Sequence, residues 1–286
     1  MDDVWNWKKS SRQMLASFSL AIAVLASQSA QAEGIVEKIR SNGQFNVATE
    51  AAYEPYEFIE DGQITGYSKQ ILDYVVADLG VELNQLDLPF QGILPGLIAG
   101  KYDFVATSVS INEKRAARYA YTRPVGTNQN IILVREADER INEPKDLAGM
   151  VVATQLASSM EPVATEHSKS LETAGGEGYS DLKLFQAIPE TIVALASSQV
   201  DAVIVGSVQA AVAIKRRPGT FRIAAELGNP RYLAWVARTE DKDLRDYMNV
   251  KIGELVDSGK IAEWQNEWFG FEMDMPSSGY LPEGAQ

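Results

Sequence analysis

One short stretch of the sequence combines the residue types that bind a small anion. Residues 104–106, Phe-Val-Ala, have the composition of a buried strand, and Ser108 and Ser110 follow them. Ser110 and Glu113 have the Ser-x-x-Glu spacing of a capping box, which predicts that a helix starts at Ser110. Arg115 would then lie in the first turn, where backbone N–H groups, hydroxyls and a guanidinium fork would converge on a carboxylate. The alternative is that Ser110 only caps a helix and Arg115 is a solvated surface charge.

Other kinds of chemistry lack the residues that they need. The chain has no cysteine, which excludes disulfides and thiolate metal sites, and its one histidine, His167, lies in the polar stretch 165–169. A Ser-His-Asp triad or a multi-histidine metal site is therefore not expected, and no cofactor is predicted. The formal net charge of −13 argues against nucleic acid as a partner, because phosphate binding depends on a basic surface.

Residues 1–32 have the features of a secretory signal peptide. Three basic residues within 8–12 precede an apolar run over 14–26, and residues 30–32, Ala-Gln-Ala, form a small-x-small cleavage site. We expect cleavage after Ala32 and export to the periplasm. A retained signal anchor is the alternative, whereas a lipid anchor through cysteine is excluded because no cysteine follows the apolar run.

The first part of the mature chain alternates strands and helices. We expect strands at 45–49 and 81–88, helices at 68–79 and 93–99, and then the strand before Ser108. Such an order predicts a largely parallel sheet that binds ligands beyond the carboxyl ends of its strands.

A second sheet is expected after the charged stretch 135–144. Strands are predicted at 150–154, 182–185, 200–205 and 221–224. Residues 158–161 form another capping box, which predicts that a helix starts there, and further helices are expected at 190–198 and 208–214. The apolar segment 232–237 is expected to return to the first sheet and to pair with the strand 131–134. Long closing helices follow, and the tail after residue 270 has an irregular composition.

The predicted fold is therefore α/β and two-lobed, each lobe being a mostly parallel sheet flanked by helices. The first lobe would comprise residues 33–135 and 232–286, and the second residues 136–231. Two crossing strands would serve as the hinge, with bending confined to residues near 134–137 and 229–232.

Several motifs together resemble a known family, the extracytoplasmic solute-binding proteins of ABC importers, in the branch that binds polar amino acids. The strongest is Ser/Thr-x-Ser/Thr-Ile-x-x-x-Arg after a strand, matched by residues 108–115. Supporting matches lie at 95–103, 146–149, 200–203 and 268–270, so the resemblance spans essentially the whole mature chain. It implies the periplasmic-binding-protein fold described above.

The resemblance also implies roles for individual residues. Arg115 would pair with the carboxylate of the ligand, with Ser108 and Ser110 forming hydrogen bonds around it. Ser159 occupies the position of a threonine that closes on the carboxylate from the second lobe.

The chain departs from the family pattern where the ligand's ammonium group is usually held. The family places an aspartate after the strand 200–205, and this chain has Gly206. A buried ammonium without an anion costs several kcal/mol, so another carboxylate must replace it or the ligand has no free α-ammonium. Glu50 is the best substitute, unless it is only a solvated loop carboxylate. Ser68 and Gln70 also replace acids that are frequent in the family.

The resemblance further implies aromatic walls at Tyr53 and Phe90. Their ring faces would attract a delocalised or quaternary cation, with Glu50 as its counter-ion. A zwitterion with a shielded cation fits these residues: an ectoine-like ring, a betaine or an N-substituted amino acid. An ordinary polar amino acid stays open, and so does a purely structural role for the two rings.

Three classes of function are compatible with the sequence. The favoured one is a monomeric periplasmic receptor, not an enzyme, that captures a small carboxylate-bearing zwitterion by hinge closure and delivers it to an ABC transporter permease. The alternatives are a periplasmic dehydratase of the cyclohexadienyl type, which resembles the same family, and a ligand-sensing module.

Overall fold

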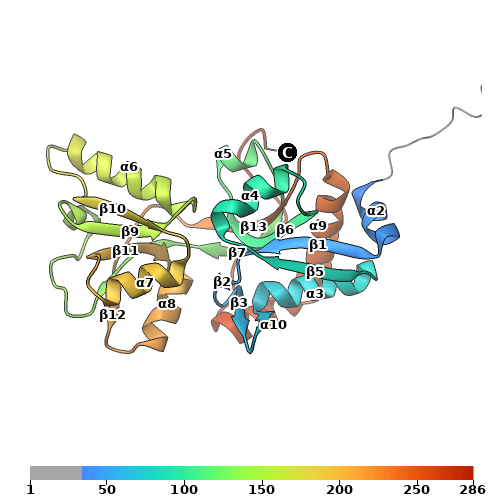
Figure 1. Cartoon of the computed structure of the whole chain (residues 1–286), viewed down its shortest axis with the longest axis horizontal. Helices are drawn as coiled ribbons and strands as arrows, with labels where there is room; N and C mark the ends of the chain where they lie inside the picture. Colours follow the sequence, from blue (N-terminus) through green and yellow to red (C-terminus); the bar gives the residue numbers. More distant parts are fainter. Residues whose placement is uncertain (1–33, 286) are drawn as a thin grey trace, which may run out of the picture.

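The computed structural model describes residues 34–285, which form two lobes side by side (Figure 1). The predicted signal peptide, residues 1–32, therefore lies outside the described residues. Within 34–285, the helices are all too short or too polar to cross a membrane.

The first lobe is built on a five-stranded sheet with the order β5-β1-β6-β13-β7. Four of its strands run in the same direction and β13 runs against them, because β13 pairs antiparallel with both β6 and β7. The strand bounds are β1 Gln44–Thr49, β5 Glu82–Asp87, β6 Phe104–Ser110, β7 Ala120–Asn128 and β13 Arg231–Ala237.

Helices cover this sheet because each carries one apolar face. In α3, for example, Ile71, Leu72, Val75 and Leu79 are buried, as the 3.6-residue periodicity predicts. A small antiparallel sheet, β2-β3-β4, lies within the loop after β1 and was not predicted. The remaining bounds are β2 Ala52–Tyr53, β3 Glu57–Glu60, β4 Gln63–Thr65, α2 Ile35–Asn42, α3 Tyr67–Leu79, α4 Phe90–Ile98, α5 Glu113–Ala116, α9 Lys242–Asp257 and α10 Lys260–Phe269.

The second lobe contains a sheet of the same design, with the order β10-β9-β11-β8-β12. Here β8 is the strand that runs against the other four. The predicted strands and helices of this lobe are present, with bounds β8 Asn130–Arg135, β9 Val151–Gln155, β10 Asp181–Phe185, β11 Ala202–Gly206, β12 Phe221–Glu226, η1 Pro144–Leu147, α6 Met160–Thr173, α7 Ile188–Ala196 and α8 Ser207–Arg216.

The predicted pairing of residues 131–134 with 232–237 is wrong. Residues 131–134 belong to β8, which pairs with β11 and β12 in the second lobe, whereas 232–237 belong to β13 in the first. The first crossing between sheets is therefore at Gln129, and the segment 134–137 lies inside the second lobe. Both segments are apolar strands buried on two faces, so local composition could not distinguish their partners.

Two short segments lead from one sheet to the other, between the lobes in Figure 1. One is Gln129, between β7 and β8, and the other spans 227–230, between β12 and β13. The side chain of Gln129 donates a 2.9 Å hydrogen bond to the backbone oxygen of Gly228, which ties the two crossings together.

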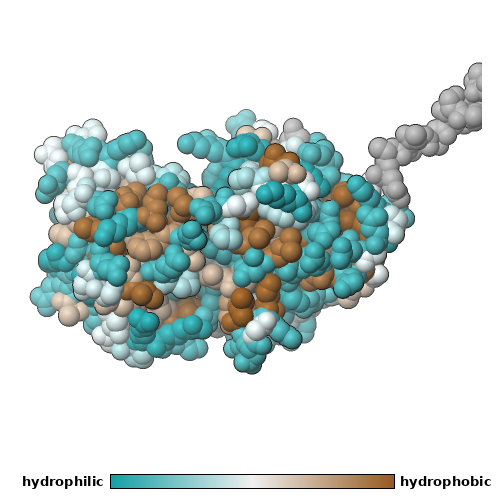
Figure 2. All heavy atoms as spheres, in the orientation of Figure 1, coloured by the Kyte–Doolittle hydropathy of each residue, from teal (hydrophilic) through white to brown (hydrophobic). Residues whose placement is uncertain are grey.

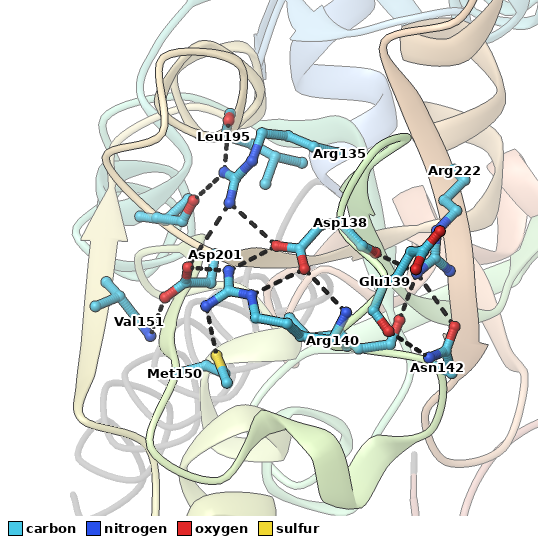
Figure 3. Close-up of polar contacts among 12 residues, drawn as sticks. Arg135, Asp138, Glu139, Arg140, Asn142, Met150, Val151, Leu195, Asp201 and Arg222 are labelled. Carbon is cyan, nitrogen blue, oxygen red and sulfur yellow. Dashed lines mark hydrogen bonds and ion pairs between the residues drawn. The ribbon is translucent and has the colours of Figure 1, made fainter.

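An ion-pair network fixes the charged segment that follows β8 (Figure 3). The nearly buried carboxylate of Asp138 lies 3.2 Å from a guanidinium nitrogen of Arg135 and 2.7 Å from one of Arg140. Arg140 also reaches Asp201 at 2.7 Å, next to the start of β11, and Arg222 donates to the backbone oxygen of Asp138. The segment is thus a structural brace of the second lobe and not a hinge.

Candidate functional site

The helix that carries Arg115 starts later than the sequence predicted. Ser110 is the last residue of β6, where it pairs with Leu233 of β13, so it cannot cap a helix. Asn112 is the N-cap instead, and its side chain accepts a 3.0 Å hydrogen bond from the backbone N–H of Arg115. Because α5 has only four residues, the guanidinium of Arg115, not a helix dipole, is the main source of positive charge there.

Arg115 is held between the two lobes without a counter-ion. Its guanidinium lies 5.4 Å from the centre of the Phe90 ring and donates a 2.9 Å hydrogen bond to the backbone oxygen of Ala157 in the second lobe. Burial lowers the pKa of this guanidinium. No carboxylate of residues 34–285 forms an ion pair with it, so the site favours an incoming anion.

Two predicted serines meet beside this guanidinium. The hydroxyl of Ser159 donates a 2.9 Å hydrogen bond to that of Ser110, from the start of α6 to the end of β6. Ser159 is the N-cap of α6, although its side chain does not accept from the helix. Because each hydroxyl can both donate and accept, the pair can turn toward an anion held by Arg115.

A cleft of about 810 Å³ opens next to these residues, between α5 and α6. Figure 2 shows the surface hollowed between the lobes at this place. The walls include three cationic side chains (Lys114, Arg115 and Arg231), two acidic ones (Glu113 and Glu166) and His167, whose pKa burial lowers. The cleft therefore leads from solvent to Arg115 through a surface with an excess of basic groups.

Glu50 also lies where the two lobes meet. It is 4% exposed, directly after β1, and one carboxylate oxygen accepts a hydrogen bond from the side-chain amide of Gln155 at the end of β9. Burial raises the pKa of Glu50 to about 8, although the bond from Gln155 opposes the rise. The alternative of a solvated loop carboxylate is therefore wrong, because the carboxylate is buried and bonded to the other lobe.

A second buried acid, Glu57, lies behind the predicted serines. Its Oε1 accepts hydrogen bonds from the hydroxyl of Thr107, at 2.5 Å, and from the backbone N–H of Ser108, at 3.0 Å. Burial raises its pKa to about 7. Its Oε2 has no hydrogen-bond partner within 34–285, and neither has the hydroxyl of Ser108. The sequence suggested Glu57 only as a candidate acid–base group of the dehydratase alternative, and its burial behind the serines could not be predicted because β3 was not predicted.

The two predicted aromatic walls pack on different neighbours. Tyr53 stacks on Tyr56 with a centroid distance of 5.4 Å, whereas Phe90 packs on Arg115. The hydroxyl of Tyr53 accepts a 3.3 Å hydrogen bond from the side chain of Asn128. Whether either ring contacts a ligand stays a prediction.

Amide side chains fill the space in front of Gly206. A Cβ atom there would overlap the Oε1 atom of Gln209 and the side-chain amide of Asn128. Sequence analysis missed both residues and also Gln155. One signal was available, since Asn128 and Gln155 directly end buried strands, where ligands of such sheets bind.

The model of the bacterial extracellular solute-binding proteins, family 3, matches residues 45–271. The chain belongs to this family. Its similarity to the L-cystine-binding protein TcyJ of Escherichia coli (strain K12) is 24% identity over 259 residues, covering 89% of this chain and 94% of that protein. A probable histidine-binding protein of Campylobacter jejuni is 23% identical over 214 residues, which cover 74% and 80% of the two chains.

Solved structures of amino acid-binding proteins have the same fold as this family 3 protein. A mutant of ArgBP from T. maritima aligns with a TM-score of 0.73 and 26% identity, covering 82% of this chain and 99% of the other. The ancestral amino acid-binding protein AncCDT-1, a precursor of cyclohexadienyl dehydratase, has a TM-score of 0.73 at 24% identity and covers 83% and 100%. The predicted two-lobed α/β fold and the family resemblance are both confirmed.

Proposed function

We propose that this family 3 protein is the receptor of an ABC importer for an amino acid or a derivative of one. The observation that carries the proposal is Arg115, a partly buried guanidinium without a carboxylate partner, next to the Ser110–Ser159 contact between the lobes. A ligand carboxylate would supply the missing anion in bidentate geometry and would bridge both lobes through the two hydroxyls.

The cationic part of the ligand lies toward Glu50. No lysine or arginine within 34–285 pairs with this buried carboxylate, and its partner Gln155 is neutral. A buried acid in such surroundings holds a proton unless a cation approaches it. A zwitterion that extends from Arg115 to Glu50 would complement both charges, which supports the predicted class of ligand.

Entry of the ligand requires the lobes to part. The direct contacts of Ser159 with Ser110 and of Gln155 with Glu50 join the lobes in the structure, so a ligand replaces at least some of them. Closure around a ligand that contacts both lobes is then favoured, and the closed form is what a permease recognises. We further propose that the receptor works as a monomer in the periplasm, beside a permease in the inner membrane.

A ligand screen tests this proposal. The mature protein is heated with single amino acids, opines, betaines and ectoines, and its melting temperature is recorded. A ligand at 100 times its dissociation constant stabilises the folded form by about 2.7 kcal/mol, which shifts the melting temperature by a few degrees. We expect at least one carboxylate-bearing zwitterion to do so, and a screen without any such shift would contradict the receptor function.

The same screen distinguishes a receptor from a dehydratase. Any ligand that shifts the melting temperature is incubated with pure protein at 25 °C and analysed by mass spectrometry. We expect the ligand to be recovered unchanged, because the similar proteins described above are named as binding proteins. Loss of water from the ligand, together with carbon dioxide in the case of a cyclohexadienyl acid, would favour the enzyme if it is absent with heat-denatured protein.

A further inference from the structure

Two amide side chains from different lobes meet between the sheets, in front of Gly206. Asn128 ends β7 in the first lobe, and Gln209 lies in the first turn of α8 in the second. They are 6% and 5% exposed. A Cβ atom on Gly206 would overlap both amides, so a larger residue at this position would displace them from their present places.

Each amide donates one hydrogen bond through its nitrogen, but neither carbonyl oxygen accepts one from the described part of the chain. Asn128 donates to the hydroxyl of Tyr53 at 3.3 Å, and Gln209 donates to the backbone oxygen of Glu54 at 3.3 Å. The carbonyl oxygens of Asn128 and Gln209 accept no hydrogen bond from residues 34–285. Buried carbonyl oxygens normally have a donor, so this pair is arranged to receive one from a bound molecule.

Within 34–285, no charged side chain forms a hydrogen bond with either amide, although Glu50 and Glu57 lie near enough to Tyr53 to raise its pKa. Both amides are neutral, and Glu50 already shares its carboxylate with Gln155 elsewhere on the interlobe surface. A cation would therefore be bound at Glu50, where a carboxylate compensates it, and a neutral N–H or O–H group would be bound by the amides.

We propose that Asn128 and Gln209 form a subsite for a neutral hydrogen-bond donor, and that the ligand is a carboxylate with a distal cation and no free α-ammonium. The inference rests on the proposed receptor function. Arg115 would bind the carboxylate, Glu50 the distal cation and the two amides the neutral group near the carboxylate. Nα-acylated basic amino acids have all three features, and ω-amino carboxylic acids have the first two.

Matched ligands test the subsite in the wild-type protein. Isothermal titration calorimetry is performed with L-lysine, L-arginine, their Nα-acetyl derivatives and 6-aminohexanoate, which is lysine without its α-ammonium. We expect an Nα-acetyl derivative or 6-aminohexanoate to bind at least tenfold more tightly than the corresponding free amino acid. If the free amino acids bind as tightly or more tightly, the subsite is overturned while the receptor function stands. Binding by none of these probes nor by the wider screen would overturn both.

Two isosteric variants test the residues themselves. Gln209→Glu and Asn128→Asp each place a carboxylate at the subsite. Each should change the ratio between the affinities for a free α-amino acid and for its Nα-acetyl derivative by at least tenfold, in favour of the free amino acid. Gln199→Glu, at an exposed glutamine of the same lobe, makes the same charge change and should leave the ratio as in wild type. If one variant fails to fold, the other gives the ratio, and an unchanged ratio in a folded variant would refute the assignment. If neither folds, the wild-type ligand comparison decides.

Discussion

Glu54 and Arg216 form an ion pair across the two lobes, with 2.6 Å between a carboxylate oxygen and a guanidinium nitrogen. Glu54 lies in the loop after β2, and Arg216 is the last residue of α8. The pair lines a separate pocket from the Arg115 cleft, so the lobes also contact each other away from Arg115.

This ion pair should contribute little to ligand affinity. Arg216 is 65% exposed, and exposed pairs typically contribute about 0 to 1 kcal/mol. Arg216→Ala should therefore weaken binding by less than about fivefold, and the effect should vanish in 1 M salt. Calorimetry on the double-mutant cycle with Glu54→Gln measures the coupling; a loss of a hundredfold would show that this pair controls closure.

Arg115 should be indispensable for a carboxylate ligand. Arg115→Lys keeps the charge but loses the planar fork, and we expect affinity to fall by at least tenfold, and by about a hundredfold in Arg115→Gln. Arg118→Gln, at an exposed arginine outside the cleft, removes the same charge and should have little effect. Calorimetric dissociation constants for the best ligand of the screen decide; an Arg115→Lys value close to wild type would disprove the anchor role.

Ligand binding should depend on pH through Glu50. The pKa of this carboxyl is raised to about 8, so below pH 8 it carries a proton that a cationic group must displace. Affinity for a ligand with a distal cation should therefore rise between pH 6 and 8 and level off above. Glu57 and Asp87 also repel the ionised form.

Calorimetry in two buffers of different ionisation enthalpy measures the released proton directly. In Glu50→Gln the release should be lost and affinity should become weak and nearly independent of pH, whereas Glu57→Gln should retain the release. Equal heats in both buffers for the wild type at pH 7 would speak against Glu50 as the counter-ion.

The brace of the second lobe should stabilise it down to low pH. Hydrogen bonding to Arg140 lowers the pKa of Asp138 from its usual 3.8 to about 2. Such a group stabilises the fold fully above its unfolded pKa, and the stabilisation, about 2 kcal/mol, is lost as pH falls through the folded value.

Urea unfolding of wild type and Asp138→Asn at pH 7 and pH 2 tests the brace. The free energy of unfolding should differ by about 2 kcal/mol or more at pH 7, with the difference much smaller at pH 2. Asp257→Asn, at an exposed helix end, serves as the control. A difference that does not change with pH would mean that Asp138 acts through packing alone.

The hinge should bend at residues 128–130 and 227–231, where the chain passes between the sheets. Small-angle scattering should show a smaller radius of gyration with saturating ligand than without, and Gln129→Ala, which removes the bond to Gly228, should enlarge the difference. Identical curves with and without ligand would count against closure.

Local patterns in the sequence were sufficient for most elements but not for their partners. The apolar periodicity of α3 predicts a helix, and the apolar runs of β6 and β11 predict strands, because each pattern fits one kind of element. By contrast, β7 was missed, since residues 122–124, Thr-Arg-Pro, interrupt its apolar character. The partner of β13 lies more than a hundred residues away along the chain, so only tertiary packing determines it.

The residues of the candidate site likewise fall into those that the sequence could predict and those that it could not. Arg115, Ser110 and Ser159 could be predicted from motifs and do lie together in the structure. Asn128 and Gln209 could not be predicted, because a single amide at the end of a strand or in a helix forms no recognisable sequence motif. Their importance depends on Gly206, which brings them together only in the folded chain.

The place of β13 inside the first sheet also determines the order in which the protein can be assembled. The second lobe consists of one continuous stretch, 130–226, so all its strands can pair as soon as this part has emerged from the ribosome or the export channel. The first sheet must wait for residues 231–237, which lie between β6 and β7. Until then both strands have an open edge, and a chaperone that binds nascent exported chains should engage this lobe for longer than the other.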